Sequence, residues 1–328
     1  MKIFVTGATG YIGNVVVEHA VRAGHNVEGL VRDNNKAGKL SQLGAKPVFG
    51  DLQSFEVLSA AASRADAVLH LAYIHDFTMD YEEVLRIDAA AVDALGMPLN
   101  GTGKALVVTS GTAIVEPDPA GSETNEDSPV SQTFVLRDRI RSERHALRLS
   151  EEGVRVSALR LPPYVYGRGG SYFVPLLMQK AAELGQSIYV DDGTLRTSAV
   201  HVDDAAELYL LAASKAKPGE VFNCTGSTNT SLRQLAEAIG AALELPVRSV
   251  SREEAEAKWG QFLTAFVQFE NRASSAKAGR KLGWRPQATH NLLADITVGS
   301  YAELAQQLRS QPREGSELRG SATAEVSA

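Results

Sequence analysis

The chain has a single cysteine, Cys224, among its 328 residues. One thiol excludes an intrachain disulfide framework and any zinc cluster built on several cysteines, and such scarcity is typical of proteins from the reducing cytoplasm. No stretch approaches the roughly 18 apolar residues of a membrane-spanning helix, and the N-terminal residues lack the charged and apolar regions of a signal peptide. We therefore expect a cytoplasmic protein with no membrane partner and no cysteine-based metal site.

An excess of positive charge is also missing. The sequence has 33 Lys and Arg against 39 Asp and Glu, which gives a formal net charge of −6. Proteins that bind nucleic acid usually carry a basic patch or stripe, whereas the cations here are scattered along the chain. The composition therefore predicts no nucleic-acid partner and favours a small-molecule substrate.

Short runs rich in Val, Ile, Leu and Ala alternate with longer amphipathic segments in the first half of the chain. The short runs predict buried parallel strands at Lys2–Thr6, Asn26–Val31, Lys46–Phe49, Ala67–Leu71, Ala105–Thr109 and Arg155–Leu161. The longer segments predict helices at Tyr11–Ala23, Asn35–Leu43, Phe55–Ser63, Tyr81–Leu95 and Gln132–Glu152. This alternation indicates the α/β class, with a doubly wound parallel sheet.

The regular alternation of strands and helices ends after Gly167, where Gly and Pro residues separate shorter predicted elements. Helices are expected at Tyr172–Glu183, Asp203–Ala213, Leu232–Leu243 and Arg252–Trp259. We predict a dinucleotide-binding domain at 1–167 and a smaller, mainly substrate-side subdomain at 168–310 that partly returns to the core. Residues 311–328 show no apolar periodicity, which predicts a disordered tail.

A glycine-rich loop follows the first predicted strand. Gly7-Ala8-Thr9-Gly10-Tyr11-Ile12-Gly13 lies directly between that strand and the first helix. Glycines in this context permit a tight turn and a close approach of the backbone to a pyrophosphate at the helix N-terminus, although a purely structural turn is the alternative. We assign the cofactor phosphates to Gly7, Thr9, Gly10, Tyr11, Ile12 and Gly13.

The residues after the second strand bear on the choice of cofactor. An acidic residue there binds the ribose hydroxyls of NAD, whereas a basic residue favours the 2′-phosphate of NADP. Arg32 comes first, followed by Asp33 and then Lys36. We therefore expect NADP, while NAD is possible if Arg32 is only a solvated loop residue and Asp33 binds the ribose.

Several further motifs occur in a characteristic order: Gly50-Asp51-Leu52, His70-Leu71-Ala72, Val107-Val108-Thr109-Ser110-Gly111, Leu161-Pro162-Pro163-Tyr164-Val165-Tyr166-Gly167, His201-Val202-Asp203-Asp204 and Leu282-Gly283-Trp284-Arg285-Pro286. With them, the sequence resembles the extended short-chain dehydrogenases/reductases, the NAD-dependent epimerase/dehydratase group, over about residues 1–300. The resemblance implies a Rossmann-type fold and a homodimer formed through the helices near Tyr81–Leu95 and Gln132–Glu152. It also implies cofactor contacts at Asp51, Leu52, Leu71, Ala72 and Pro162.

One departure from the family concerns the general acid/base. The family places a tyrosine on a helix with a lysine four residues later, and no Tyr-x-x-x-Lys occurs in this chain. Anchoring on Glu143, which the family often carries four residues after the lysine, places Val135 at the tyrosine position and Arg139 at the lysine position. Valine cannot transfer a proton, but an arginine stays charged and can bind ribose hydroxyls.

Three other side chains are candidates for the missing acid. Ser110 ends the fifth strand, where it could donate to a substrate oxygen or simply satisfy the backbone. Tyr73 follows the fourth strand, where it could supply phenol chemistry or an aromatic wall. Tyr164 follows the sixth strand, at the carboxyl end of the sheet where ligands bind in such folds.

These observations leave three functions open. The favoured one is an NAD(P)-dependent oxidoreductase or epimerase-like enzyme acting on a carbonyl, hydroxyl or sugar-like small molecule, with an atypical proton donor. The second is a non-redox dehydratase or cyclase on the same fold. The third is a redox-silent NADP-binding regulator, which the valine at position 135 favours.

Overall fold

The computed structural model describes residues 1–75 and 78–310, so the predicted tail at 311–328 lies outside the described residues. The described chain forms two compact units. Unit 1 contains residues 1–165, 197–229 and 269–289, and unit 2 contains the described residues of 166–196, 230–268 and 290–310.

Unit 1 is built on a seven-stranded sheet in the order β10-β6-β5-β4-β1-β2-β3. Every neighbouring pair is parallel. The strands are β1 Lys2–Thr6, β2 Asn26–Val31, β3 Lys46–Phe49, β4 Ala67–His70, β5 Ala105–Gly111, β6 Arg155–Leu161 and β10 Glu220–Asn223. Because β1 lies between β4 and β2, the strand order reverses there, and the carboxyl ends of β1 and β4 form the switch point at which such sheets bind ligands. The predicted α/β class and doubly wound sheet are confirmed.

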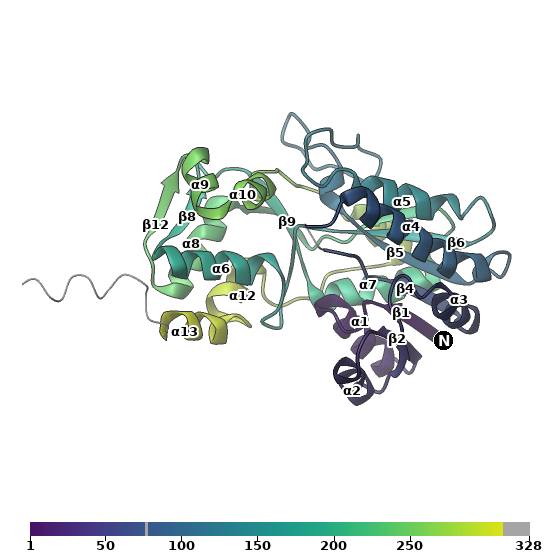
Figure 1. Cartoon of the computed structure of the whole chain (residues 1–328). Coiled ribbons are helices and arrows are strands. Elements are labelled where there is room, and N and C mark those ends of the chain that lie inside the picture. Colours follow the sequence, from purple (N-terminus) through teal and green to yellow (C-terminus); the bar gives the residue numbers. More distant parts are fainter. Residues whose placement is uncertain (76–77, 311–328) are drawn as a thin grey trace, which may run out of the picture. The chain divides into compact units, whose positions relative to one another are not determined.

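Helices cover both faces of this sheet (Figure 1). They are α1 Tyr11–Arg22, α2 Asn34–Gln42, α3 Phe55–Arg64, α4 Tyr81–Gly96, α5 Arg139–Arg148, α7 Val202–Lys215 and α11 Ala276–Leu282. Val16, Val107 and Leu208 belong to the core on the α1 and α7 side. Leu58 and Leu95 belong to the core on the α3 and α4 side. The sheet is therefore buried on both faces, as its continuous apolar strands predict.

Helix α5 begins at Arg139, so the prediction that it starts at Gln132 was wrong. The Ser131 hydroxyl accepts hydrogen bonds from the amides of Thr133 and Phe134, and the Gln132 amide donates to Glu116. Side chains thus capture N–H groups that a helix would use, which favours a turn. Val135 lies in this turn and is 43% exposed.

A three-stranded sheet, in the order β11-β9-β7, takes β7 Tyr164–Tyr166, β9 Arg196–His201 and β11 Ser227–Ser231. Unit 2 contains a parallel pair, β8 Ser187–Val190 and β12 Val247–Val250. Its helices are α6 Phe173–Leu184, α8 Leu232–Leu243, α9 Arg252–Trp259, α10 Gln261–Val267, α12 Leu292–Val298 and α13 Ala302–Ser310. Among the described residues, no helix has the length and apolar character to cross a membrane, and no three His, Cys, Asp or Glu side chains are grouped as metal ligands.

Candidate functional site

The loop between β1 and α1 can exist only with glycine at its key positions. Gly7 has a φ of +69°, and a Cβ there would lie 2.8 Å from the Ala72 amide nitrogen. A Cβ on Gly13 would lie 2.0 Å from the Gly7 carbonyl oxygen. Gly10 is the N-cap of α1 and no side chain caps this helix. A close-packed backbone loop at an uncapped helix N-terminus suits a pyrophosphate, so the residues fit a dinucleotide.

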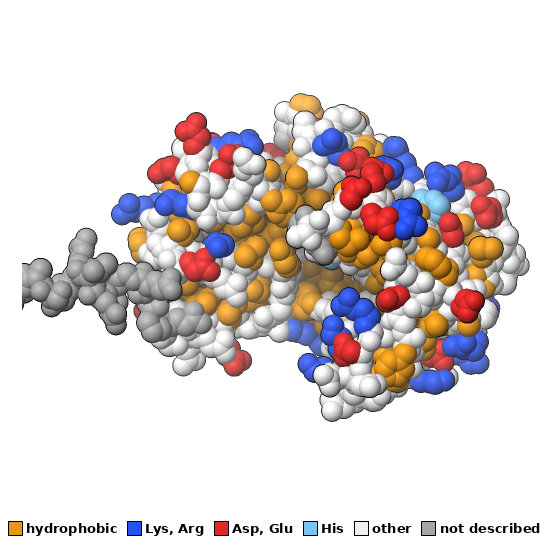
Figure 2. All heavy atoms as spheres, in the orientation of Figure 1, with side chains coloured by type: hydrophobic (Ala, Val, Ile, Leu, Met, Phe, Trp, Pro, Cys, Tyr) orange, Lys and Arg blue, Asp and Glu red, His pale blue; other side chains and the backbone are white. Residues whose placement is uncertain are grey.

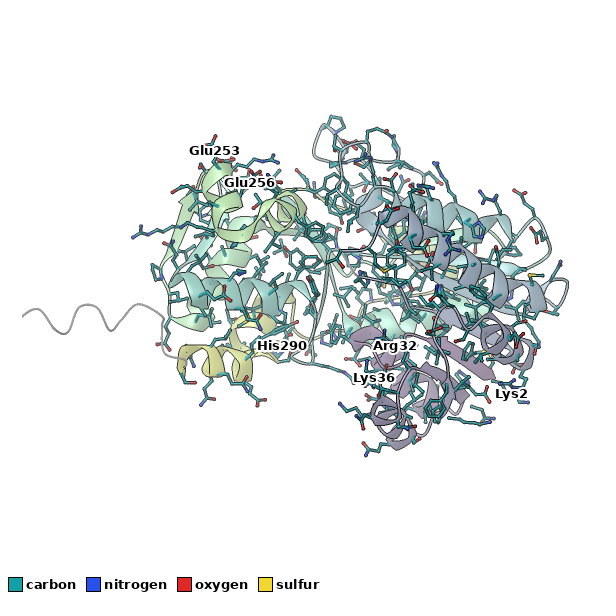
Figure 3. The ribbon with its side chains drawn as sticks, in the orientation of Figure 1. Lys2, Arg32, Lys36, Glu253, Glu256 and His290 are labelled. Atoms are coloured by element: carbon teal, nitrogen blue, oxygen red, sulfur yellow. The ribbon has the colours of Figure 1, made fainter. Side chains whose placement is uncertain are left out.

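The residues expected at the adenosine end lie after β2 and β3. Arg32 is exposed, and Asp33 caps α2 by accepting a hydrogen bond from the Lys36 amide at 2.9 Å. Arg32 and Lys36 are labelled at this end of unit 1 in Figure 3. Asp51 accepts hydrogen bonds from the Ser54 hydroxyl and the Gln53 amide, and these bonds lower the pKa of its carboxyl group.

The segment after β4 packs directly against the phosphate loop. The Thr6 hydroxyl accepts a hydrogen bond from the Ala72 amide at 3.2 Å and lies 2.8 Å from Nδ1 of the buried His70. The Leu71 amide donates to the Thr6 carbonyl. Leu71 and Ala72 are therefore held beside the glycine loop, as a contact with a dinucleotide requires.

The Arg139 side chain packs on the Tyr73 ring near this segment. The Arg139 guanidinium carbon lies 3.2 Å from the centroid of the Tyr73 ring, and one of its nitrogens donates to the Thr109 carbonyl at 2.9 Å. The Tyr73 hydroxyl donates to that of Tyr81 at 3.3 Å. Burial raises the pKa of Tyr81, so this acceptor stays neutral at physiological pH. Two of the residues singled out from the sequence, Tyr73 and Arg139, are thus brought together.

A buried carboxylate, that of Asp88, lies close to Arg139. The Oδ1 atom of Asp88, in α4, is 3.6 Å from Nε2 of His70 and 4.0 Å from a guanidinium nitrogen of Arg139. Burial opposes ionisation, but His70 and the Arg139 charge hold the pKa of Asp88 below its ordinary value. Sequence reasoning missed Asp88. The signal was available, since this acid lies at core spacing from Val84 and Val92 on an amphipathic helix.

The remaining candidate residues are buried. Ser110 is 6% exposed, and its strand neighbour Thr109 points to the other face, where its hydroxyl bonds to the His70 carbonyl and to Tyr209. Tyr164 is 1% exposed, and burial raises the pKa of its phenol, which makes its proton hard to release. Pro162 is buried between β6 and β7.

An internal ion pair fixes the position of α5. Glu143 accepts two hydrogen bonds from Arg160 of β6, at 2.9 and 2.6 Å, and both side chains are buried. A bidentate pair of this kind constrains both distance and orientation. It holds α5 against β6 at a point one turn after Arg139.

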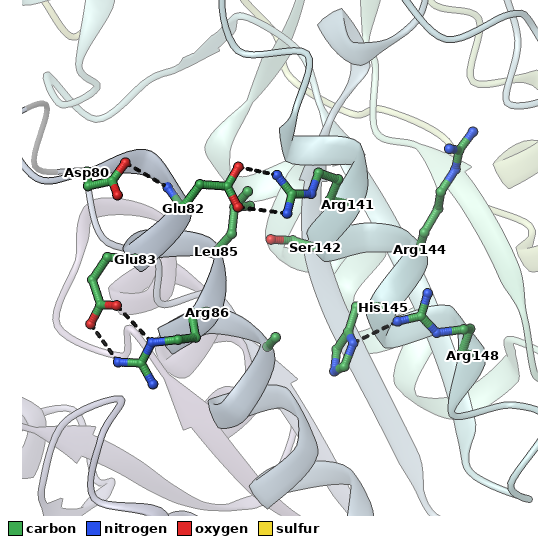
Figure 4. Close-up of a pocket in the computed structure, with 11 residues that line it drawn as sticks. Asp80, Glu82, Glu83, Leu85, Arg86, Arg141, Ser142, Arg144, His145 and Arg148 are labelled. Atoms are coloured by element: carbon green, nitrogen blue, oxygen red, sulfur yellow. Dashed lines mark hydrogen bonds and ion pairs between the residues drawn. The ribbon is translucent and has the colours of Figure 1, made fainter.

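A hollow of about 630 Å³ lies on the surface of α4 and α5, and Figure 4 shows the residues that line it. Its charged side chains are largely paired, since Glu82 binds Arg141 and Glu83 binds Arg86. Acidic and basic side chains are also interspersed over the visible face of unit 1 in Figure 2. We assign no cofactor role to this hollow, because the glycine loop and its neighbours lie elsewhere in unit 1.

Comparison with known proteins agrees with this geometry. The protein C2A9.02 of Schizosaccharomyces pombe is 38% identical over 302 residues, which cover 92% of this chain and all of that protein. The 4-hydroxy-2-methyl-3-oxo-4-farnesyl-3,4-dihydroquinoline-1-oxide ketoreductase of Stigmatella aurantiaca is 26% identical over 88% of this chain and 93% of its own length. The structure of MoeE5 in complex with UDP-glucose and NAD has a TM-score of 0.72 at 22% identity, covers 93% of this chain and 100% of MoeE5, and shows the same fold.

The family assignment rests on a match over most of the chain. The model described as "NAD dependent epimerase/dehydratase family" matches residues 3–225, from β1 through the seven strands of the unit 1 sheet. This range includes the glycine loop, Tyr73, Asp88 and Arg139. The chain belongs to the NAD dependent epimerase/dehydratase family.

Proposed function

We propose that this chain is an NADPH-dependent oxidoreductase that reduces a carbonyl group of a small molecule, with Tyr73 as the proton donor. The observation that carries the proposal is the Arg139 guanidinium packed on the Tyr73 ring, 3.2 Å from its centroid. A phenol next to a fixed cation combines an exchangeable proton with charge stabilisation of its anion. The ketoreductase among the relatives supports carbonyl chemistry for this chain.

In this mechanism the chain's own residues handle the proton. When bound, the reduced nicotinamide supplies a hydride to the carbonyl carbon. Tyr73 transfers its phenolic proton to the carbonyl oxygen, which yields an alcohol and a tyrosinate. The Arg139 charge stabilises that tyrosinate, while the bond to the Thr109 carbonyl holds the guanidinium in place. Solvent then returns the proton to Tyr73.

The preference for NADPH over NADH follows from charge after β2. Arg32 is exposed, whereas the Asp33 carboxylate already accepts the Lys36 amide as a helix cap. A cation at this place attracts a 2′-phosphate, and an occupied carboxylate competes less well for ribose hydroxyls. We therefore assign the 2′-phosphate to Arg32, with Lys36 nearby.

The test combines binding with turnover. Purified protein is titrated with NADPH, NADP, NADH and NAD by fluorescence, and oxidation of the reduced cofactor is then followed with a panel of ketones, aldehydes and nucleotide sugars. We expect tighter binding of NADPH than NADH, and oxidation with at least one carbonyl compound. Tight binding with no oxidation across the panel would contradict the proposal.

A non-redox enzyme is the second candidate, because the chain has no Tyr-x-x-x-Lys pair and Val135 lies in an exposed turn. It predicts conversion of a substrate while the cofactor absorbance stays constant. A regulator predicts cofactor binding without conversion of any substrate. The same assay, with product analysis by mass spectrometry, separates these outcomes.

We further propose that the chain forms a homodimer through α4 and α5. The family resemblance supports this, and so does the exposed face of α5, which carries Arg141, Arg144 and Arg148 opposite acidic groups of α4. Light scattering should give twice the mass of the chain. Arg144→Glu should shift the protein toward the monomer, whereas a monomeric wild-type protein would contradict the dimer.

A further inference from the structure

Asp88 is a charged group that the proposed reaction does not use. Its side chain is 5% exposed in the packed space between α4, α5 and the sheet. A buried carboxylate is costly unless other groups stabilise its charge. The Arg139 guanidinium supplies a stabilising charge, and the imidazole of His70 also lies near the carboxylate.

The contact between Asp88 and Arg139 is electrostatic. Among the described residues, His70 Nε2, Asp88 Oδ1 and one terminal nitrogen of Arg139 are all inaccessible and have no hydrogen-bond partner. Their separations of 3.6 and 4.0 Å permit Coulomb attraction but exceed hydrogen-bond lengths. The negative charge of Asp88, more than its shape, therefore acts on Arg139.

The same cluster reaches the glycine loop through His70. Nδ1 of His70 lies 2.8 Å from the Thr6 hydroxyl, and that hydroxyl accepts the Ala72 amide beside Gly7. Asp88 is thus placed between the residue that precedes the phosphate loop and the cation that packs on Tyr73.

We propose that Asp88 is a positioning residue: its charge holds the Arg139 guanidinium on the Tyr73 ring. Within residues 1–75 and 78–310, the Arg139 guanidinium donates one hydrogen bond, to the Thr109 carbonyl, which fixes one of its nitrogens. The attraction to Asp88 supplies the second constraint, which prevents rotation of the guanidinium away from the ring. The effect on turnover rests on the proposed function, whereas the effect on Arg139 does not.

The first test is spectroscopic and needs no substrate. The Nε–H signal of Arg139 is identified in a ¹⁵N spectrum by its loss in Arg139→Lys. Protons held over an aromatic face have a shifted resonance, so in Asp88→Asn this signal should move toward the position of exposed arginines. Asp88→Glu, which keeps the charge, should return it toward the wild-type position. An unchanged signal in Asp88→Asn would overturn the proposal.

The second test is kinetic. Asp88→Asn should lower kcat by roughly tenfold or more, because displacement of a catalytic group by about 1 Å has effects of this size or larger. Asp93→Asn is the matched control, since Asp93 is on the same helix but pairs with His145 near the surface. Equal kcat values for Asp88→Asn and the wild type would contradict the proposal. A shifted Arg139 signal in a protein without turnover would instead support the positioning role and reject the proposed function.

A double variant covers the case in which Asp88→Asn does not fold. Asp88→Asn leaves the partly buried Arg139 charge without this partner, whereas Asp88→Asn/Arg139→Gln removes both charges. The proposal predicts that the double variant is more stable to urea than Asp88→Asn alone. A double variant that is no more stable would show that the two charges do not interact.

Discussion

The two ends of the candidate cofactor site in unit 1 differ in the chemical groups that form them. At the phosphate end, the proposed binding group is the backbone of one loop, and glycines keep that backbone free of side chains. At the Tyr73 end, groups from separate elements meet: the Asp88 carboxylate from α4, the Thr109 backbone carbonyl from β5 and the Arg139 guanidinium from α5. The first end depends on steric fit within one short segment. The second end depends on charges that are close in space but distant in the sequence.

This difference predicts that the phosphate end tolerates no added atoms. Gly13→Ala would place its Cβ 2.0 Å from the Gly7 carbonyl oxygen, so the loop must open. We expect the Kd for NADPH to rise by about 100-fold, which corresponds to roughly 2.7 kcal/mol. Gly38→Ala is the control, since no atom lies within 4 Å of the added carbon. Fluorescence titration measures both, and equal affinities would contradict the loop assignment.

At the Tyr73 end, charge should matter more than volume. Arg139→Gln removes the cation next to Tyr73 and should lower kcat by roughly 30-fold, which is less than the roughly 100-fold contribution of a general acid because the phenol itself remains. Arg139→Lys keeps the charge but loses the planar stacking, so its loss should be smaller. Steady-state oxidation of NADPH measures both. A larger loss for the lysine variant would contradict an electrostatic role.

A substitution at the adenosine end should change the affinity for NADPH and leave that for NADH unchanged. Arg32→Ala should weaken NADPH by about tenfold, the value of one charge-assisted hydrogen bond of about 1.5 kcal/mol, and leave NADH unchanged. Lys39→Ala, which removes a cation from the last turn of α2, serves as the control. If Arg32→Ala weakened both cofactors equally, the preference for NADPH would lose its basis.

The smallest expected effect is on stability at low pH. The folded-state pKa of Asp88 lies below its ordinary value of about 3.9. Its contribution to the free energy of unfolding is therefore present above about pH 4 and is lost as the pH falls through the folded-state pKa. Urea unfolding from pH 6 to pH 2.5 should show this loss in the wild type but not in Asp88→Asn. If the free energy of unfolding fell equally in the two proteins over this range, Asp88 would not contribute to the loss of stability at low pH.

The sequence predicted those parts of the fold that depend on local pattern. Strands Lys2–Thr6 and Asn26–Val31 were predicted at their observed bounds, because apolar runs between glycines and polar residues mark buried strands. The start of α5 was not predicted. Its sequence pattern extends to Gln132, but the Ser131 hydroxyl and Glu116 capture the amides that a longer helix would need.

The candidate site divides in the same way. The glycine loop could be found because its function depends on adjacent residues. The contact of Arg139 with Tyr73 joins residues 66 positions apart in the numbering and depends on how α5 is anchored by Glu143 and Arg160. The spacing of Asp88 on its helix could have marked it as buried, but its role depends on His70 and Arg139, which are distant in the sequence.

The measurement that tests the central claim most directly is the kcat of Tyr73→Phe at saturating NADPH, with Tyr189→Phe in unit 2 as the matched control. Loss of the phenolic hydroxyl should lower kcat by about 100-fold, the lower end of the contribution of general acid catalysis, and leave the Kd for NADPH within about twofold of the wild-type value. A variant with wild-type kcat would show that Tyr73 does not donate the proton.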